Sequence, residues 1–145
     1  FRAPEILNGI ATQTAAVDVW SAGIILLSLI TAKPYILSQH DKNANGNDVD
    51  ASHLKEIEEI VGKTETQQLN EGEEYGDGSQ HENTTGWAAK ATQSVIPGRI
   101  DQIGVQRLDQ ALDLLSKMLN VRPSKRITSQ EALNHPFLQS AVNRT

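Results

Sequence analysis

The sequence lacks cysteine, and its four histidines are scattered along the chain. Without cysteine the protein can have neither a disulfide framework nor a cysteine-ligated zinc site. A reducing compartment is therefore permitted, and the spacing of the histidines indicates no metal centre. We predict no metal-binding residue in this sequence.

Long apolar runs are also missing. The longest, AGIILLSLITA from Ala22 to Ala32, is about half of the roughly 20 residues that a membrane-spanning helix requires. The chain begins Phe-Arg-Ala-Pro and does not show the basic segment and short apolar core of a signal peptide. We therefore expect no membrane partner and no secretion.

Positive charge is not concentrated anywhere. The net charge is −5, and residues 63–86, with one lysine and six carboxylates, account for all of it. The balanced remainder has no basic patch, and the acidic stretch would repel phosphate, so we expect no direct binding of nucleic acid. Residues 63–86 are also poor in apolar side chains, which predicts a mobile acidic insert.

Motifs of the common enzyme classes are absent as well. The sequence contains neither G-x-x-x-x-G-K-[ST] nor G-x-G-x-x-G, and Ser21 and Ser28 have no histidine at a suggestive spacing. The glutamates of residues 63–86 are typical of a solvated surface rather than of a catalytic carboxylate pair. We therefore predict no catalytic and no cofactor-binding residue in this chain.

Helical patterns dominate what is present. Pro4 and Asn8-Gly9 delimit a short helical turn from Pro4 to Leu7. Residues 16–31 form a helix that is apolar on nearly all sides, and such a helix is expected in the middle of a structure. Residues 38–50 have the composition of a loop.

Three further helices are expected after that loop. An amphipathic surface helix covers Ser52 to Val61, with Asp50 or Ser52 as its cap, and another helix covers Leu108 to Leu119. Thr128 and Glu131 form a capping box that starts the final helix, which His135-Pro136 ends. Since no segment predicts a strand, we expect an all-α fold.

Two carboxylates are unusual in this pattern, because Glu5 and Asp18 lie in the first turns of apolar helices. The simplest interpretation is that each meets a helix N terminus, which contributes roughly 0.3 to 1 kcal/mol. The alternative is that each has a specific partner. The two residues alone leave both interpretations open.

Three segments in order, FRAPEIL, AVDVWSAGIILLSLIT and LDLLSKMLNVRPSKRITSQEALNHPFL, resemble the C-terminal lobe of a eukaryotic protein kinase. They are similar to the A-P-E that closes the activation segment, to the central D-x-W-S-x-G helix, and to the arginine connector and terminal helix. The resemblance implies that residues 1–138 are the C-terminal part of a kinase domain without the N-lobe sheet. It leaves 63–86 as an insert and 139–145 as a tail.

The resemblance implies partners for both carboxylates. Glu5 is similar to the A-P-E glutamate, which forms a buried ion pair with the connector arginine, here Arg126. Asp18 is similar to the aspartate that accepts hydrogen bonds from the catalytic loop, and that loop is not in this sequence. Trp20 and Gly23 resemble the packing residues of the same central helix.

The first two residues and the end of the central helix also have counterparts. Phe1 and Arg2 occupy the end of the stretch that contacts the substrate residue just after the phosphoacceptor, with simple loop packing as the equal alternative. Ala32 stands where many kinases have glycine, a mild departure from the family pattern.

The function that the resemblance implies is that of a Ser/Thr protein kinase that uses ATP and Mg²⁺ and acts on protein substrates. FRAPE, QTAAVDVWSAGIILLSL, the insert and TTGW are most similar to the replication-initiating cell-division-cycle-seven (DDK) kinases. These nuclear kinases require a regulatory subunit and phosphorylate serines in acidic contexts.

Two alternatives stay open: a cyclin-dependent-type kinase, and a pseudokinase or helical protein-binding scaffold. The motifs for phosphate transfer lie upstream of A-P-E in kinases. We therefore expect the chain to be a fragment that is inactive alone, from a nuclear or otherwise cytoplasmic parent.

Overall fold

The computed structural model describes residues 2–9, 14–32, 46–61 and 104–142. All regular elements in these residues are helices, and no strand occurs among them, so the predicted all-α fold class is confirmed. Phe1 and the predicted acidic insert, 63–86, lie outside the described residues. The elements are α1 (Pro4–Leu7), α2 (Ala16–Thr31), α3 (Gly46–Val61), α7 (Val105–Met118), η1 (Pro123–Lys125), α8 (Ser129–Leu133) and α9 (Pro136–Val142).

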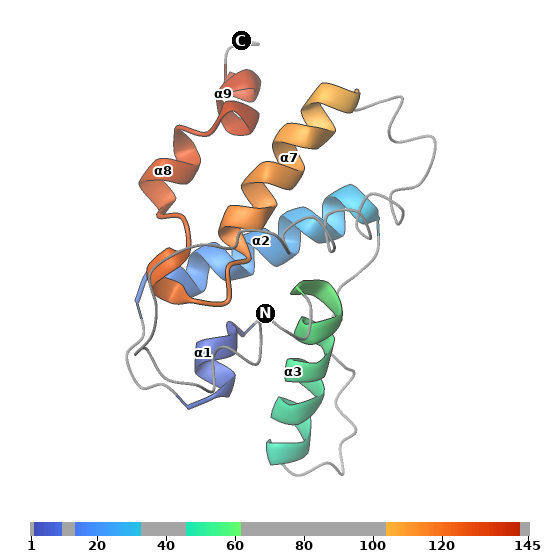
Figure 1. Ribbon diagram of the computed structural model, residues 1–145, viewed down its shortest axis with the longest axis vertical. Helices are drawn as coiled ribbons and strands as arrows, with labels where there is room; N and C mark the ends of the chain where they lie inside the picture. Colours follow the sequence, from blue (N-terminus) through green and yellow to red (C-terminus); the bar gives the residue numbers. More distant parts are fainter. Residues whose placement is uncertain (1, 10–13, 33–45, 62–103, 143–145) are drawn as a thin grey trace, which may run out of the picture.

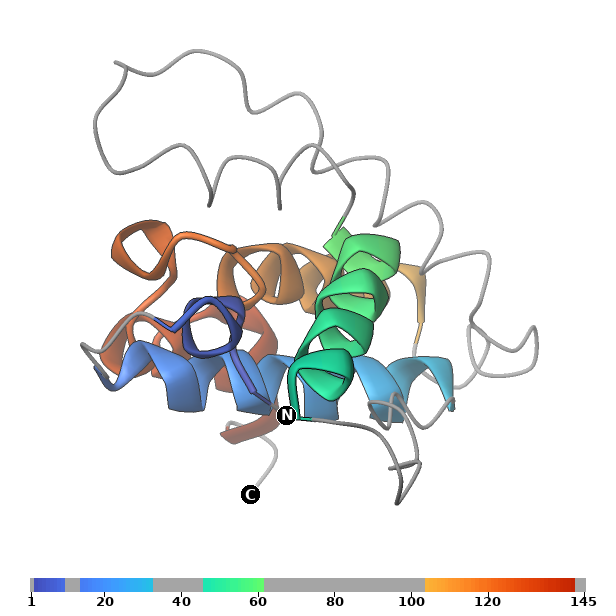
Figure 2. The same ribbon diagram turned by 90° about the horizontal axis from the view of Figure 1, so that it is seen from below.

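Helix α2 is the central element. In Figure 1 it runs across the molecule, with α7, α8 and α9 above it and α1 and α3 below it. Figure 2 shows α1, α3 and α7 on the same side of α2. The main core lies where these helices meet, and its most deeply buried side chains include Trp20, Ile24, Leu27, Ile57 and Leu115.

The structure confirms the predicted bounds of α1 and α2, but α2 is not buried on all sides. Ile25 is 48% exposed and Leu29 is 63% exposed. With Asp18 and Ala22, which are also exposed, they form a row at helical spacing that we call the α2 stripe. The expectation of burial on nearly all sides is therefore wrong for this stripe, because the described helices pack on the other faces of α2.

Helices α2 and α7 approach closely at Gly23. A Cβ atom at this position would lie 2.8 Å from Leu119 Cδ2 and 3.1 Å from Met118 Cβ. A larger residue at this position would force Leu119 and Met118 to shift. Helix α7 begins at Val105, three residues before the predicted start at Leu108.

The prediction for the start of α3 is wrong. The helix begins at Gly46, so Asp50 and Ser52, predicted as caps, lie inside it, and residues 46–50 are not a loop. Polar residues such as asparagine and aspartate occur both in loops and in first helical turns, and composition does not separate the two. The later turns are fixed by packing, since Ile57 and Val61 are buried.

The capping box at α8 is confirmed. Thr128 Oγ1 accepts a hydrogen bond from the Glu131 N–H at 3.2 Å, and the Glu131 carboxylate accepts one from the Thr128 N–H at 2.9 Å. The hydrogen bonds from Thr128 lower the pKa of Glu131. Helix α8 is not the final helix, however, because α9 begins at Pro136 and continues to Val142. Proline suits a first helical position, so His135-Pro136 separates two helices.

Candidate functional site

A buried ion pair joins α1 to the segment that follows α7. The Arg126 guanidinium donates to both oxygens of Glu5, from Nη1 to Oε1 at 2.7 Å and from Nη2 to Oε2 at 2.9 Å. The Arg126 side chain is 0% exposed and that of Glu5 is 2% exposed. Two parallel bonds of this kind are the strongest arrangement of arginine and a carboxylate. The structure thus brings together the two residues that the resemblance pairs, 121 positions apart.

Helix α1 carries Glu5 into the interior. Pro4 occupies the first helical position, where its missing N–H group costs nothing. Ala3, Pro4 and Glu5 are all buried, so the carboxylate does not face water at the helix N terminus. The interaction with the guanidinium is therefore the dominant one for Glu5.

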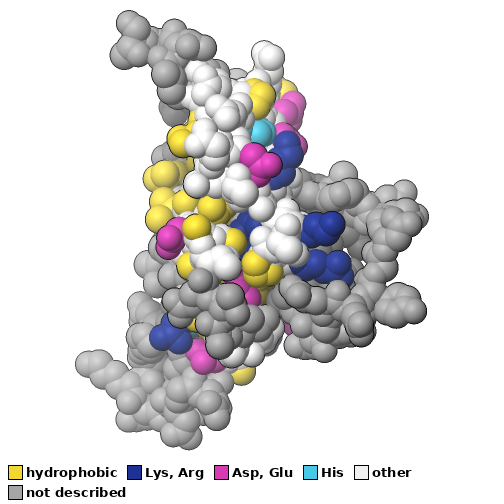
Figure 3. All heavy atoms as spheres, turned by 90° about the vertical axis from the view of Figure 1, so that its left-hand side faces the viewer, with side chains coloured by type: hydrophobic (Ala, Val, Ile, Leu, Met, Phe, Trp, Pro, Cys, Tyr) yellow, Lys and Arg dark blue, Asp and Glu magenta, His cyan; other side chains and the backbone are white. Residues whose placement is uncertain are grey.

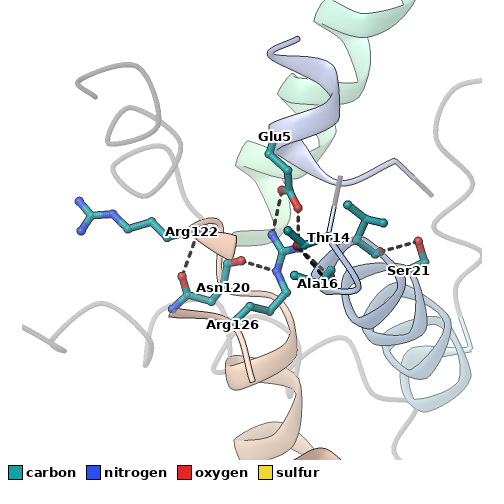
Figure 4. A network of polar contacts seen from close by, with 8 residues as sticks. Glu5, Thr14, Ala16, Ser21, Asn120, Arg122 and Arg126 are labelled. Carbon is teal, nitrogen blue, oxygen red and sulfur yellow. Dashed lines mark hydrogen bonds and ion pairs between the residues drawn. The ribbon is translucent and has the colours of Figure 1, made fainter. Parts of the chain in front are cut away.

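Backbone carbonyl groups hold the other side of Arg126. Its Nε donates to the Asn120 carbonyl at 2.9 Å, and its Nη1 donates to the Ala16 carbonyl at 2.7 Å. The Cζ atom lies 5.1 Å from the centre of the Trp20 ring, within the range of a cation–π contact. As Figure 4 shows, the guanidinium connects α1, the start of α2 and the connector, residues 120–126. We call Glu5, Arg126 and these contacts the clamp.

No sequence pattern had pointed to two further residues at the clamp. The Asn120 side-chain oxygen accepts a hydrogen bond from the Arg122 N–H at 3.0 Å, which forms an Asx turn in the connector. Thr14 Oγ1 accepts one from the Ala16 N–H at 3.3 Å at the start of α2. The sequence NVRP, in which an asparagine stands two residues before the N–H group of Arg122, was the signal that could have indicated the turn.

The clamp is a positioning device rather than a catalytic group. Its carboxylate is almost completely enclosed, and both oxygens already bind the guanidinium. Neither side chain is therefore accessible to a substrate. Removing one member would leave the other as an unpaired buried charge, at a cost of about 3 to 5 kcal/mol.

The other predicted support residues lie on α2. Trp20 is fully buried and contacts Arg126, and Gly23 permits the close approach of α7. Asp18 is exposed in the first turn of α2 and lies on the α2 stripe. No hydrogen bond or ion pair joins the Asp18 carboxylate to another residue in the described part of the chain, so the structure does not bring this side chain into the clamp.

At the N-terminal end, Arg2 contacts α3. Its Nη1 lies 3.3 Å from Asp50 Oδ1, and the two side chains are 63% and 37% exposed. Arg2 therefore stands at the surface, three residues before the buried Glu5. Its predicted neighbour at the substrate edge, Phe1, is outside the described residues.

A second polar cluster joins α7 to the junction of α8 and α9. Asp113 Oδ2 lies 2.8 Å from His135 Nε2 and 2.7 Å from Lys117 Nζ. His135 Nδ1 accepts a hydrogen bond from the Phe137 N–H at 3.3 Å, which leaves Nε2 as the donor to Asp113. Partial burial raises the pKa of Asp113, but hydrogen bonds and charges from Lys117 and His135 outweigh it, so that pKa lies below its ordinary value.

The described residues contain neither a cluster of metal ligands nor a membrane-spanning helix. No group of three or more His, Cys, Asp or Glu side chains that could hold a metal ion occurs in 2–9, 14–32, 46–61 or 104–142. None of the helices described in these ranges has the length and apolar character needed to cross a membrane.

Comparison with known proteins gives a consistent result. Residues 1–138 match the family model for the protein kinase domain. The chain is 30% identical over 140 residues to a probable cyclin-dependent kinase 8 of Dictyostelium discoideum, covering 96% of the chain and 34% of that protein.

Two yeast proteins are similar at comparable levels. The cell cycle serine/threonine-protein kinase hsk1 of Schizosaccharomyces pombe is 34% identical over 152 residues, covering 95% of the chain and 28% of that protein. The serine/threonine-protein kinase KDX1 of Saccharomyces cerevisiae is 36% identical over 141 residues, with 95% and 28% covered. The chain therefore spans about a third or less of the length of these relatives.

Proposed function

This chain belongs to the protein kinase domain family, and on that basis we propose that the whole protein is an ATP-dependent Ser/Thr protein kinase. Residues 1–138 supply the helical lobe that positions the activation segment and the catalytic loop. The chain itself contributes support for these parts and no group that transfers phosphate.

The clamp is the observation that carries this proposal. It holds the FRAPE segment to the connector through two short bonds at a buried site. In a kinase the FRAPE segment closes the activation segment. A buried charge pair fixes its partners in one arrangement, because any displacement leaves a charge unpaired. The clamp therefore keeps the substrate-facing segment in a single position relative to α2.

The α2 stripe supports a second part of the proposal. Ile25 and Leu29 are large apolar residues with 48% and 63% exposure. In Figure 3, hydrophobic side chains gather at the left edge of the middle of the visible face, and most of the lysine and arginine side chains lie to the right of them. Apolar surface of this kind marks a contact area. We infer that the stripe contacts the catalytic loop of the whole protein, with Asp18 accepting backbone hydrogen bonds from that loop.

The cofactors of such a kinase would be ATP and Mg²⁺. No group of three or more His, Cys, Asp or Glu side chains that could hold a metal ion occurs in the described residues. The sequence likewise has no glycine-rich phosphate loop. We assign neither cofactor to a residue of this chain and derive no step of phosphate transfer from it.

Within the kinases we propose a replication-initiating, cell-division-cycle-seven type. The similarity to hsk1, whose name describes a cell cycle kinase, favours this subgroup. Such a kinase would act in the nucleus with a regulatory subunit and would phosphorylate serines in acidic contexts. Phe1 and Arg2 would then contact the substrate residue after the phosphoacceptor.

A cyclin-dependent type is the second candidate. The similarity to the probable cyclin-dependent kinase 8 favours it equally, as does the similarity to cyclin-dependent kinase 12 of Caenorhabditis elegans, 32% identical over 146 residues. Preference for an acidic residue beside the phosphoacceptor would distinguish the two types.

The test of function is a transfer assay with the whole protein. The protein is incubated with labelled ATP, Mg²⁺ and two serine peptides, which carry either aspartate or asparagine directly after the serine. We expect the label to be transferred to serine. Stronger labelling of the aspartate peptide supports the replication-initiating type, and equal labelling counts against it. If the protein binds partner proteins but transfers no phosphate, with every peptide and regulatory subunit tried, the pseudokinase or scaffold is favoured instead.

A further inference from the structure

Two arginine–carboxylate pairs with opposite geometry are found among the residues that the structure describes. The pair of Arg126 and Glu5 is buried and has two bonds of 2.7 and 2.9 Å. The pair of Arg2 and Asp50 has one contact of 3.3 Å, and its side chains are 63% and 37% exposed. The first pair is suited to hold a structure together, whereas the second can exchange partners.

The exposed pair leaves most of the Arg2 guanidinium available. Arginine carries five N–H donors, and Asp50 occupies one of them. In the described part of the chain no second side chain forms a hydrogen bond or an ion pair with Arg2. A planar guanidinium with an open edge binds a carboxylate or phosphate through two parallel bonds. Arg2 can therefore accept a second anion that approaches from solvent.

Asp50 acts against such an anion. Its carboxylate partly neutralises Arg2 and repels an incoming negative group. Because α3 packs against α1, Asp50 stays beside the segment that carries Arg2. The pair is exposed, so water and salt weaken it and a well-placed competitor can displace Asp50.

We propose that Asp50 is a specificity-determining residue, which lowers the affinity of the Arg2 subsite for an acidic or phosphorylated side chain of the protein substrate. The proposal rests on the proposed function, since Arg2 is a substrate contact only in a protein kinase. It assigns to α3 a role beyond packing: a neutral residue at position 50 makes the kinase more selective for acidic substrates.

The experiment compares Asp50→Asn with the unaltered whole protein. Asparagine keeps the shape of the side chain and a hydrogen-bond acceptor but removes the charge. With the aspartate peptide at about 20 mM salt, KM should fall about threefold while kcat stays unchanged. The effect should disappear at about 500 mM salt, and KM for the asparagine peptide should not change.

Two control variants make the result specific. Asp109→Asn removes the same charge from an exposed site on α7 and should leave both KM values unchanged. In an Arg2→Gln background, Asp50→Asn should lose its effect. An equal change for both peptides, a rise of KM for the aspartate peptide, or a persistent effect without Arg2 would each overturn the proposal.

A binding measurement separates this proposal from the proposed function. Fluorescence anisotropy with the same two peptides reports affinity without phosphate transfer. If no variant transfers phosphate but Asp50→Asn tightens the aspartate peptide about threefold through Arg2, the kinase function fails, and Asp50 then sets the charge preference of a peptide-binding site rather than of a kinase substrate site. If transfer is normal and anisotropy shows no charge-dependent change, the role of Asp50 fails alone.

Discussion

The clamp makes a quantitative prediction about stability. Changing Glu5 to glutamine keeps the size of the side chain but leaves the Arg126 guanidinium buried without its counter-charge. The glutamine side-chain oxygen can accept a hydrogen bond from one N–H group of the guanidinium. The glutamine NH2 group then faces the other N–H groups of Arg126, and donor faces donor. Since the Arg126 side chain is 0% exposed, no water compensates. We expect a loss of about 3 kcal/mol in the free energy of unfolding.

Changing Arg126 to methionine should cost more, about 4 to 5 kcal/mol. It strands the Glu5 carboxylate, and it also removes the hydrogen bonds to the carbonyl groups of Asn120 and Ala16. In the double variant neither buried charge remains. Its loss should therefore be no larger than that of Arg126→Met alone, with a coupling energy of at least about 2 kcal/mol.

The assay is urea unfolding of the whole protein, its two single variants and the double variant. The exposed pair serves as the matched control, because Arg2→Gln, Asp50→Asn and their combination should each change stability by less than about 1 kcal/mol. Additive losses in the Glu5 and Arg126 series would refute the reasoning. They would mean that the two side chains stabilise the protein independently.

Four further predictions concern other parts of the structure. Gly23→Ala should destabilise the protein by about 1 kcal/mol in urea unfolding. The new methyl group meets the buried Leu119 at 2.8 Å, and this clash outweighs the gain in helix propensity. An increase in stability would contradict the close approach of α2 and α7. Ala32→Gly should stabilise by about 0.5 kcal/mol, since Ala32 ends α2 with a φ of 51°, where glycine is unstrained; a lower urea midpoint would be the opposite result. The folded-state pKa of Asp113 lies below its ordinary value of 3.8, so its stabilising contribution is complete well above that pH and is lost as the pH falls through the folded-state pKa. Asp113→Asn should therefore lower the thermal midpoint at pH 7, by an amount that shrinks below about pH 4; a difference that grows on acidification would have the wrong sign. Finally, the isolated chain should aggregate or lack a cooperative unfolding transition, because the α2 stripe leaves apolar surface in water. A sharp unfolding transition in calorimetry, from a chain that sedimentation shows to be monomeric, would count against the proposed contact with the rest of the lobe.

Local signals in the sequence predicted the elements that depend on few neighbours. Pro4 and Asn8-Gly9 delimited α1, and the apolar run delimited α2. The T-x-x-E pattern predicted the capping box at α8, because both of its bonds form within four residues. These features depend on backbone geometry and adjacent side chains, which the sequence contains directly.

The errors came from segments whose state depends on packing. Residues 46–50 are polar enough for a loop, but α3 includes them because its later turns pack against the core. Pro136 ended a helix in the prediction and begins one in the structure. A proline at a first helical position and a proline after a helix are the same residue in the sequence, and only the path of the chain distinguishes them.

The candidate site was accessible from the sequence only in part. The pairing of Glu5 with Arg126 came from the resemblance, since no local pattern connects residues 121 positions apart. The carbonyl groups of Ala16 and Asn120 could not be predicted, because every residue carries such a group. Their role follows from the position that Arg126 takes among three segments.

The sequence by itself determined the helical fold, the order of the kinase landmarks and the presence of two carboxylates in first helical turns. Only the tertiary structure decided how these carboxylates differ. Glu5 is 2% exposed and bound to a guanidinium, whereas Asp18 lies exposed on the α2 stripe. The reason is physical: a carboxylate is buried only where a distant part of the chain brings it a charged partner, and that arrangement exists only once the helices have packed.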